Sequence, residues 1–241
     1  MISKNQIKWI RQLEQKKFRK RDGLFVAEGP KIVGDLMRRY QPHTVFATSD
    51  WMGTTDVNVS EDELRKISFL QHPQQVLAVF PIPVVSCSMD TTQLYLALDG
   101  IQDPGNLGTI IRIADWFGIQ KIFCSQDTVD AYNPKVVQAT MGSIAHVEVV
   151  YTNLAELLTS LPSTFPIYGT LLDGENLYSQ QLSSAGLIIM GNEGNGISQP
   201  IRQFVNHRLL IPQYSEGDTA ESLNVAIATA ITCAEFRRRL R

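Results

Sequence analysis

Short apolar segments alternate with helical segments through the second half of the chain, and this alternation constrains the fold more than any other sequence feature. Nearly all-apolar strands are typical of a parallel sheet that helices cover on both faces. We therefore predict an α/β fold with a parallel sheet here. The expected strands span residues 94–100, 121–125, 146–151, 166–172, 187–191 and 208–212, and the expected helices span 107–117, 134–141, 153–161, 200–205 and the chain from about 222 onward.

A smaller set of segments precedes this pattern. A basic amphipathic helix is expected over residues 3–21, and the alternation that follows predicts a compact α/β sandwich. Residues 81–92 contain two prolines and no helical period, which is typical of a linker. We therefore predict a small domain at 1–81, a linker at 82–92 and a second domain at 93–241. The strands of the small domain are expected at 24–29, 44–49 and 76–80, and its further helices at 31–40 and 61–67.

Positive charge is concentrated at the start of the chain. The formal net charge is -2, yet residues 1–40 hold eleven Lys and Arg against four acidic residues. A second basic cluster ends the chain, at Arg237, Arg238, Arg239 and Arg241. A polyanionic partner is expected to meet these ends first, although a run of charge is also typical of a solvated helix face.

Several classes of protein are disfavoured. The chain lacks an apolar run long enough to span a membrane and its start lacks the apolar centre of a secretory signal, so we expect a cytoplasmic protein without membrane contact. The three cysteines, Cys87, Cys124 and Cys233, are far apart and form no CxxC pair. We expect neither a disulfide framework nor a metal site, and we interpret all three as buried small residues.

The segment 98–118 contains a strand, a Gly/Pro-rich turn and a helix. At about 100° per residue, Leu107, Ile110, Ile111, Ala114 and Gly118 fall on one stripe, which should face the sheet. Arg112 lies on the far side together with Trp116 and Ile113, so a second surface should cover this face. By itself, Arg112 is more typical of a solvated helix arginine than of a functional residue.

Two further segments follow strands. Residues 187–198, LIIMGNEGNGIS, are expected to form a buried strand that runs into a glycine-rich loop, and glycine lets the backbone approach a ligand closely. It matches neither a dinucleotide fingerprint nor a phosphate loop, which disfavours a nucleotide-dependent enzyme. Glu193 within it is also compatible with an exposed turn.

The third segment opens the last helix with Ser222, Leu223 and Asn224, residue types that commonly cap helices. Beyond Asn224 the helix is small or apolar around its whole circumference, which is typical of a helix buried on every side. In a chain of this size we expect a subunit interface, and therefore a homodimer.

Together, N-x5-R-x2-D in 106–115, G-N-E-G-x-G in 191–196 and IP-x9-SLNV-x2-A in 211–228 resemble the three motifs of the SpoU class of SPOUT methyltransferases, the TrmH family. The resemblance covers residues 93–241, and it implies a parallel sheet whose C-terminal segment threads a trefoil knot. Residues 1–80 resemble the substrate-binding domain, related to ribosomal protein L30, that precedes the catalytic domain in many members.

The resemblance implies S-adenosylmethionine as cofactor, bound mainly by backbone groups. Cofactor contacts are expected at Gly191, Ile211 and Leu223. The positions that match the active site of the family are Asn106, Arg112, Ser222 and Asn224, with Glu193 near them. Because arginine side chains stay protonated in proteins, Arg112 is either a base whose proton is drawn off by a neighbour or a cation that stabilises the developing alkoxide.

These expectations define an RNA methyltransferase that acts on a ribose 2′-hydroxyl, with ribosomal RNA favoured as substrate. A tRNA 2′-O-methyltransferase and a non-catalytic RNA-binding dimer are the alternatives. The RNA is expected to contact the basic side chains of Lys16, Lys17, Arg19, Lys20 and Arg21.

Overall fold

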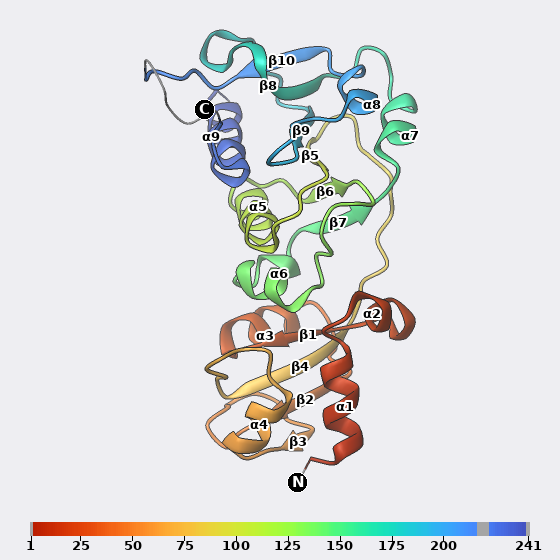
Figure 1. The fold of residues 1–241 in the computed structure, drawn as a ribbon, viewed down its shortest axis with the longest axis vertical. Coiled ribbons are helices and arrows are strands. Elements are labelled where there is room, and N and C mark those ends of the chain that lie inside the picture. Colours follow the sequence, from red (N-terminus) through yellow and green to blue (C-terminus); the bar gives the residue numbers. More distant parts are fainter. Residues whose placement is uncertain (1, 216–221, 240–241) are drawn as a thin grey trace. The chain divides into compact units, whose positions relative to one another are not determined.

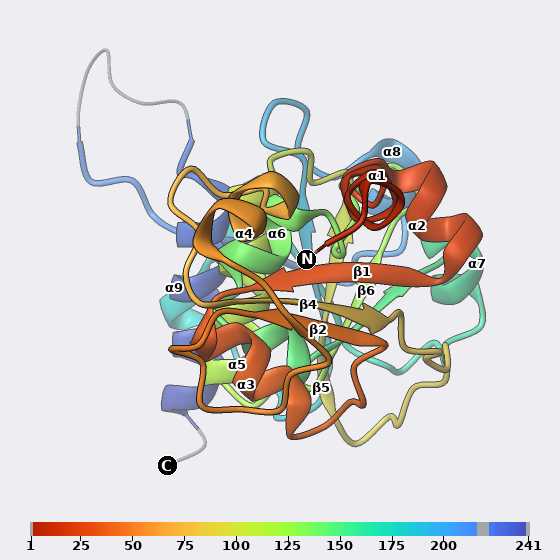
Figure 2. The same ribbon diagram turned by 90° about the horizontal axis from the view of Figure 1, so that it is seen from below.

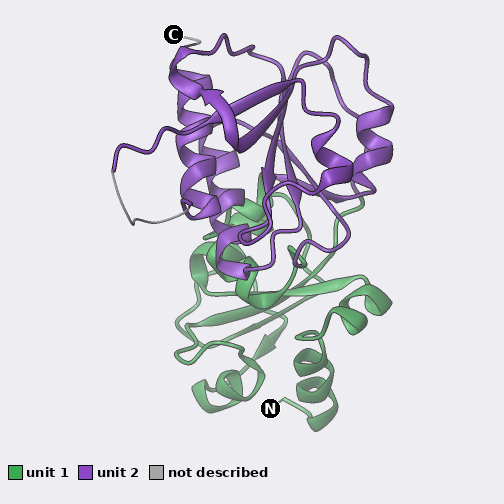
Figure 3. Ribbon diagram, turned by 45° about the horizontal axis from the view of Figure 1, so that its top comes forward, with its two compact units in different colours: residues 1–84, 130–146 green, residues 85–129, 147–241 purple. Residues whose placement is uncertain are grey.

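The computed structural model describes residues 2–215 and 222–239 (Figure 1). The chain forms two compact units, one of residues 1–84 with 130–146 and one of 85–129 with 147–241 (Figure 3). The predicted mixed α/β class is confirmed. The division of the chain into functional domains at 1–81 and 93–241, joined by a linker at 82–92, stays a prediction. Segment 130–146, which the sequence assigns to the second domain, belongs to the first unit.

The first unit is built on a four-stranded sheet of order β1-β4-β2-β3, in which β1 and β2 pair with β4 antiparallel and β2 pairs with β3 in parallel. Figure 2 shows β1, β4 and β2 side by side. The strands are β1 (Leu24–Glu28), β2 (Thr44–Ala47), β3 (Val57–Asn58) and β4 (Val76–Pro81). The helices are α1 (Lys4–Gln12), α2 (Lys16–Asp22), α3 (Pro30–Met37), α4 (Glu61–Ile67) and α6 (Pro134–Ala139), with a 3-10 turn η1 (Ser143–Ala145).

The two faces of this sheet are both covered, because successive strand residues point to opposite sides. Val26 belongs to a buried cluster with Ile10 of α1 and Leu64 of α4. Its neighbour Phe25 packs instead against Tyr132, with ring centroids 4.8 Å apart. Segment 130–146 therefore supplies core side chains to the first unit.

The helix expected over residues 3–21 is two helices in the structure. α1 ends at Gln12, and Gln15 adopts an extended conformation before α2 begins. The break exposes backbone carbonyls, and the Arg19 guanidinium donates to those of Leu13 at 2.8 Å and Glu14 at 2.7 Å. The same guanidinium pairs with Asp130 at 2.5 Å. A buried arginine thus stabilises the break, which helical periodicity could not reveal.

The second unit contains a six-stranded parallel sheet of order β10-β8-β9-β5-β6-β7, as predicted. Whether its C-terminal segment forms the knot stays a prediction. The strands are β5 (Leu94–Asp99), β6 (Lys121–Cys124), β7 (Glu148–Tyr151), β8 (Ile167–Asn176), β9 (Gly186–Gly191) and β10 (His207–Leu210). The helices are α5 (Pro104–Trp116), α7 (Leu154–Thr159), α8 (Gln199–Arg202) and α9 (Val225–Arg238), with a 3-10 turn η2 (Leu177–Ser179).

Helices lie on both faces of this sheet: α5 and α9 pack together on one face, and α7 and α8 lie on the other (Figure 1). The predicted stripe of α5 is buried at Leu107, Ile110, Ile111 and Ala114, whereas Gly118, just beyond the helix, is exposed. Arg112 and Trp116 point away from the sheet and are exposed. Within a single chain Ile227 of α9 is exposed, so the sequence-based expectation of burial all round is not met there.

The terminal arginines mostly serve the fold of the second unit. Arg237 donates to the carbonyl of Phe117 at 2.7 Å, at the end of α5. Arg238 and Arg239 pair with the buried Glu235 at 2.8 Å and 2.7 Å. These hydrogen bonds and charges, against the opposing effect of desolvation, lower the pKa of Glu235 to about 2. The expectation that this cluster offers its charge to a polyanion is therefore weakened, and Arg241 lies outside the described residues.

The expected burial of the three cysteines can be checked directly. Cys124 and Cys233 are buried as predicted, but Cys87 is exposed because it lies in the irregular segment that follows β4. Within the described ranges, no helix is both long and apolar enough to cross a membrane. The same residues contain no group of three His, Cys, Asp or Glu side chains suited to a metal ion.

Candidate active site

The candidate site lies where two neighbouring strands of the second sheet send their connections in opposite directions. β6 and β7 follow β5 on one side, whereas β9 lies on its other side. Ligands of parallel sheets bind at the carboxyl ends of strands at such a point. β5 ends at Asp99 and β9 ends at its register partner Gly191. The first predicted motif follows β5 in helix α5, and the second begins at the end of β9 and continues into its loop.

The loop after β5 turns directly into α5. The carboxylate of Asp103 caps this helix by accepting a hydrogen bond from the backbone nitrogen of Asn106 at 2.8 Å. Pro104 occupies the first helical position, where an amide hydrogen would have no partner within the helix. The cap fixes Asn106 in the first turn, beside the loop that follows β9.

The loop after β9 folds back on itself. Asn192 and Gly196 exchange backbone hydrogen bonds of 3.0 Å and 2.9 Å, and the Asn192 side chain accepts from the amides of Gly194 and Asn195. A Cβ at Gly191 would lie 2.2 Å from the carbonyl carbon of Gly196. Glycine is therefore required at 191 by the close approach of the chain to itself. This turn presents Glu193 toward α5.

Side chains from all three motifs form one hydrogen-bonded chain. Asn224 caps α9, and its Oδ1 accepts from the amides of Ala226 at 2.9 Å and Ile227 at 3.3 Å. Its Nδ2 must therefore donate, and it does so to Asn106 Oδ1 at 2.9 Å. Asn106 Nδ2 in turn donates to Glu193 Oε1 at 2.9 Å. The helix cap thus sets the direction of every hydrogen bond up to the carboxylate.

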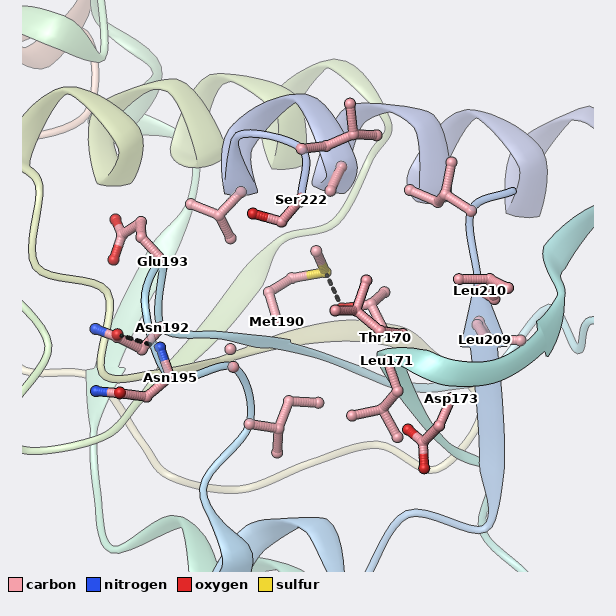
Figure 4. A pocket seen from close by; sticks show the side chains of 18 of the residues that line it. Thr170, Leu171, Asp173, Met190, Asn192, Glu193, Asn195, Leu209, Leu210 and Ser222 are labelled. Atoms are coloured by element: carbon pink, nitrogen blue, oxygen red, sulfur yellow. Dashed lines mark hydrogen bonds between the residues drawn. The ribbon is translucent and has the colours of Figure 1, made fainter. Parts of the chain in front are cut away.

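A cavity of about 440 Å³ opens beside this chain of side chains. Five of the predicted site residues line it: Gly191, Glu193, Ile211, Ser222 and Leu223. Its other walls come mainly from residues 170–173 of β8, the β9 loop and β10. Figure 4 shows Glu193 and Ser222 at one side of the cavity and Asp173 and Leu210 at the opposite side.

The remaining predicted residues lie outside the cavity lining. Asn106 and Asn224 reach it through Glu193. Arg112 is exposed on α5, and within residues 2–215 and 222–239 it makes no hydrogen bond or ion pair. Six residues separate Asn106 from Arg112, which on a helix is about 9 Å along the axis and roughly 240° around it. The two side chains therefore leave α5 in different directions.

The sequence analysis missed Asp173 and Arg202 among the cavity residues. Asp173 lies in the part of β8 where pairing with β10 jumps, because Arg208 is the partner of Gly169 and Leu209 is the partner of Glu175. A carboxylate near the end of a predicted parallel strand was the available signal. The bulge that turns it toward the cavity left no local sequence pattern.

Comparison with known families decides what kind of protein carries this site. The model of the SpoU rRNA Methylase family matches residues 93–234. The chain belongs to this family. A second model, the MRM3-like substrate binding domain, matches residues 4–78 of the SpoU methylase. Both parts of the resemblance seen in the sequence are thereby confirmed.

Relatives of this SpoU methylase match it over nearly its whole length. The 23S rRNA (guanosine(2553)-2′-O)-methyltransferase RlmP of Bacillus subtilis is 32% identical, over 98% of this chain and 97% of the relative. The structure of a candidate RNA methyltransferase of the TrmH family from Porphyromonas gingivalis has a TM-score of 0.90 at 39% identity, and 99% of each chain is covered. An rRNA methyltransferase from Sinorhizobium meliloti, solved with AdoMet bound, has a TM-score of 0.88 at 30% identity and covers 100% of this chain and 98% of that chain.

The basic side chains that the sequence assigned to RNA divide into two groups in the SpoU methylase. Lys16, Lys17, Lys20 and Arg21 are exposed on α2. Arg19 is only 1% exposed, and its guanidinium is committed to Asp130 and two carbonyls. The prediction that Arg19 contacts RNA is therefore corrected: it is a structural residue of the first unit.

Proposed function

We propose that this SpoU methylase transfers a methyl group from S-adenosylmethionine to a ribose 2′-hydroxyl of ribosomal RNA in the cytoplasm. The chain of hydrogen bonds from Asn224 through Asn106 to Glu193, at the wall of the cavity, is the observation that carries this proposal. The rRNA methyltransferases among the relatives, and the substrate-binding domain ahead of the catalytic part, support RNA as the substrate.

The cavity has the properties that the cofactor needs. Its volume of about 440 Å³ lies in the range typical of small-molecule sites. Aliphatic side chains such as Leu171, Leu209 and Ile197 line it and suit the faces of an adenine ring, and the backbone of residues 191–197 offers polar groups. When bound, S-adenosylmethionine supplies a methyl group on a positively charged sulfur. On this proposal Gly191, Ile211 and Leu223 contact the cofactor.

The protein must align the ribose hydroxyl and assist the loss of its proton. Alignment of reacting groups contributes several kcal/mol to catalysis in general. Ser222 lies in the cavity wall with a hydroxyl that can bind the ribose of the RNA. Glu193 and Asn106 hold one another in a fixed orientation, so their remaining polar atoms form a preorganised surface for the nucleotide. Arg112 then acts on the 2′-oxygen, either as a base or as a stabilising cation.

The position of Arg112 favours a dimer in which it serves the site of the partner subunit. Its side chain lies on the outer face of α5, roughly 240° around the helix from Asn106. The same layer exposes Trp116 to 85% and Ile227 of α9 to 52%. Large apolar side chains exposed together mark an interaction surface. We therefore propose a homodimer that joins these faces of α5 and α9.

An assay of the purified protein tests the proposed reaction. The protein is incubated with S-adenosylmethionine labelled in the methyl group and either ribosomal RNA or tRNA, and each RNA is then hydrolysed with alkali. Because alkaline cleavage requires a free 2′-hydroxyl, ribose methylation leaves the label in alkali-resistant dinucleotides. Label in mononucleotides would indicate base methylation, and label confined to tRNA would favour the tRNA alternative.

A non-catalytic RNA-binding dimer is the second candidate. It predicts RNA binding without transfer of label and without affinity for the cofactor. Titration of S-adenosylmethionine into the protein separates the two, because only the enzyme binds it.

A further inference from the structure

The cavity contains one carboxylate that the proposed reaction does not use, Asp173. It lies at the side opposite Glu193 and Ser222 (Figure 4). Asp173 is part of the segment 170–174, which leaves the register between β8 and its neighbours. Bulges next to active sites commonly redirect a side chain. Here the bulge brings Asp173 into the cavity wall.

The bulge is tightly fitted. A Cβ at Gly174 would lie 2.6 Å from the carbonyl carbon of Leu209 and 2.8 Å from its carbonyl oxygen. Only glycine allows the segment to pass β10 this closely. The position of Asp173 is therefore constrained by the close backbone packing of the residue that follows it.

Two arginines hold the carboxylate from one side. Arg202 of α8, which also lines the cavity, and Arg208 of β10 both donate to Asp173 Oδ2, the latter at 3.4 Å. Among the described residues no group is bonded to Oδ1. Half of the Asp173 side chain, 52%, is exposed. A carboxylate oriented by two cations thus keeps one oxygen open as an acceptor.

The surroundings of Asp173 indicate which part of the cofactor it meets. Leu171 of the same bulge and Leu209 of β10 form an aliphatic wall that suits the adenine ring. Glu193 and Ser222, where methyl transfer is proposed, lie at the other side. In the cofactor the ribose joins the adenine to the sulfur. A carboxylate oxygen beside an adenine wall is well suited to hydroxyl donors, as in the acidic residues that bind ribose in dinucleotide sites.

We infer that Asp173 recognises the ribose hydroxyls of the cofactor, oriented for this by Arg202, Arg208 and the bulge at 170–174. The inference rests on the proposed use of S-adenosylmethionine. It makes Asp173 a specificity-determining residue for the nucleoside part of the cofactor rather than for its amino-acid end.

Calorimetric titration of the full-length protein tests this inference. The ligands are S-adenosylhomocysteine, 5′-methylthioadenosine, which lacks the amino-acid end, and 2′-deoxy and 3′-deoxy forms of methylthioadenosine. The variants are Asp173→Asn and Asp173→Glu, which keeps the charge but moves the carboxylate. Glu175→Gln is the matched control, since it removes a carboxylate from the same strand outside the cavity lining.

Both Asp173 variants should bind S-adenosylhomocysteine and methylthioadenosine about tenfold or more weakly, by the same factor for both ligands. Glu175→Gln should bind like the unmodified protein. At least one deoxy ligand should bind the unmodified protein more weakly than methylthioadenosine does. For Asp173→Asn, the loss of the same hydroxyl should weaken binding little further. Thermal melting of each variant verifies that the fold is intact, and Asp173→Glu keeps the test valid if the asparagine variant unfolds.

Three results would overturn the inference. The first is unchanged binding in both Asp173 variants, and the second is a loss of affinity confined to S-adenosylhomocysteine. The third is that removing a ribose hydroxyl from methylthioadenosine lowers the affinity equally for the unmodified protein and for Asp173→Asn. The second result would assign Asp173 to the amino-acid end instead. Failure of the unmodified protein to bind any of these ligands would contradict the proposed cofactor itself, so the two failures are distinguishable.

Discussion

The side-chain amide of Asn224 donates a hydrogen bond of 2.9 Å to Asn106, which lies 118 residues earlier in the sequence. The side-chain oxygen of Asn224 meanwhile caps α9. One side chain therefore performs two tasks. The cap stabilises the helix, and the same cap orients the amide that holds Asn106 against Glu193. Substitutions that separate the two tasks follow directly.

Asn224→Asp should keep the fold and lose activity. Aspartate caps helices as well as asparagine does, so the free energy of unfolding should stay within about 0.5 kcal/mol. Its carboxylate cannot donate to Asn106, and we expect kcat to fall by about a hundredfold. Asn224→Ala should lose activity and also about 1 kcal/mol of stability. Full activity in the aspartate variant would mean that the hydrogen bond to Asn106 is not needed.

Arg112→Ala should abolish methyl transfer while cofactor affinity and melting temperature stay unchanged, because the side chain is exposed and makes no hydrogen bond or ion pair within the described residues. Calorimetry, melting and the transfer assay check the three quantities. Arg112→Lys distinguishes the two roles: a stabilising cation should be partly replaced by lysine, whereas a base with a different proton affinity should shift the pH profile of kcat. A loss of stability that matches the loss of activity would refute the assignment.

Substitutions should separate the basic residues between positions 16 and 21 into residues that bind RNA and residues that stabilise the fold. Neutral substitutions at Lys16, Lys17, Lys20 and Arg21 should weaken RNA binding and reduce its salt dependence, by about 0.7 to 0.9 in log–log slope for each phosphate that the protein no longer neutralises. Arg19→Met should instead lower the free energy of unfolding by about 3 kcal/mol, because it leaves Asp130 without its buried partner. An unchanged salt slope in the fourfold variant would mean that these side chains form only a solvated face.

The dimer predicts a link between assembly and activity. Replacing Trp116 and Ile227 by charged residues should give monomers that lose methyl transfer, since Arg112 could no longer reach the partner subunit. Light scattering at micromolar concentration measures the assembly, and melting shows whether the monomer is folded. An unmodified protein that is monomeric and active under these conditions would contradict the proposed interface.

The parts of the fold that follow from local pattern were predictable. Apolar strands identified the parallel sheet, and the periodicity of α5 placed Leu107, Ile110 and Arg112 on the correct faces. The split of the first helix was not predictable, because Asp130, far away in sequence, stabilises it through Arg19. Segment 130–146 joins the first unit for the same reason: its packing is decided by tertiary contacts.

In the candidate site, too, some residues could be predicted from local sequence motifs and others could not. Motif order pointed to Asn106, Glu193 and Asn224, and the structure brings these three together. Asp173 escaped the sequence analysis because its position depends on the close passage of Gly174 past Leu209. The predicted close approach of Gly191 to a ligand stays a prediction, whereas the structure shows a close approach of Gly191 to Gly196 of its own loop.

The most direct test of the proposed function is a map of 2′-O-methyl groups in ribosomal RNA from cells that lack the gene. Loss of a ribose methyl group, restored by the unmodified gene but not by one that encodes Arg112→Ala, is the predicted result. Ribosomal RNA with all its 2′-O-methyl groups intact would contradict the account.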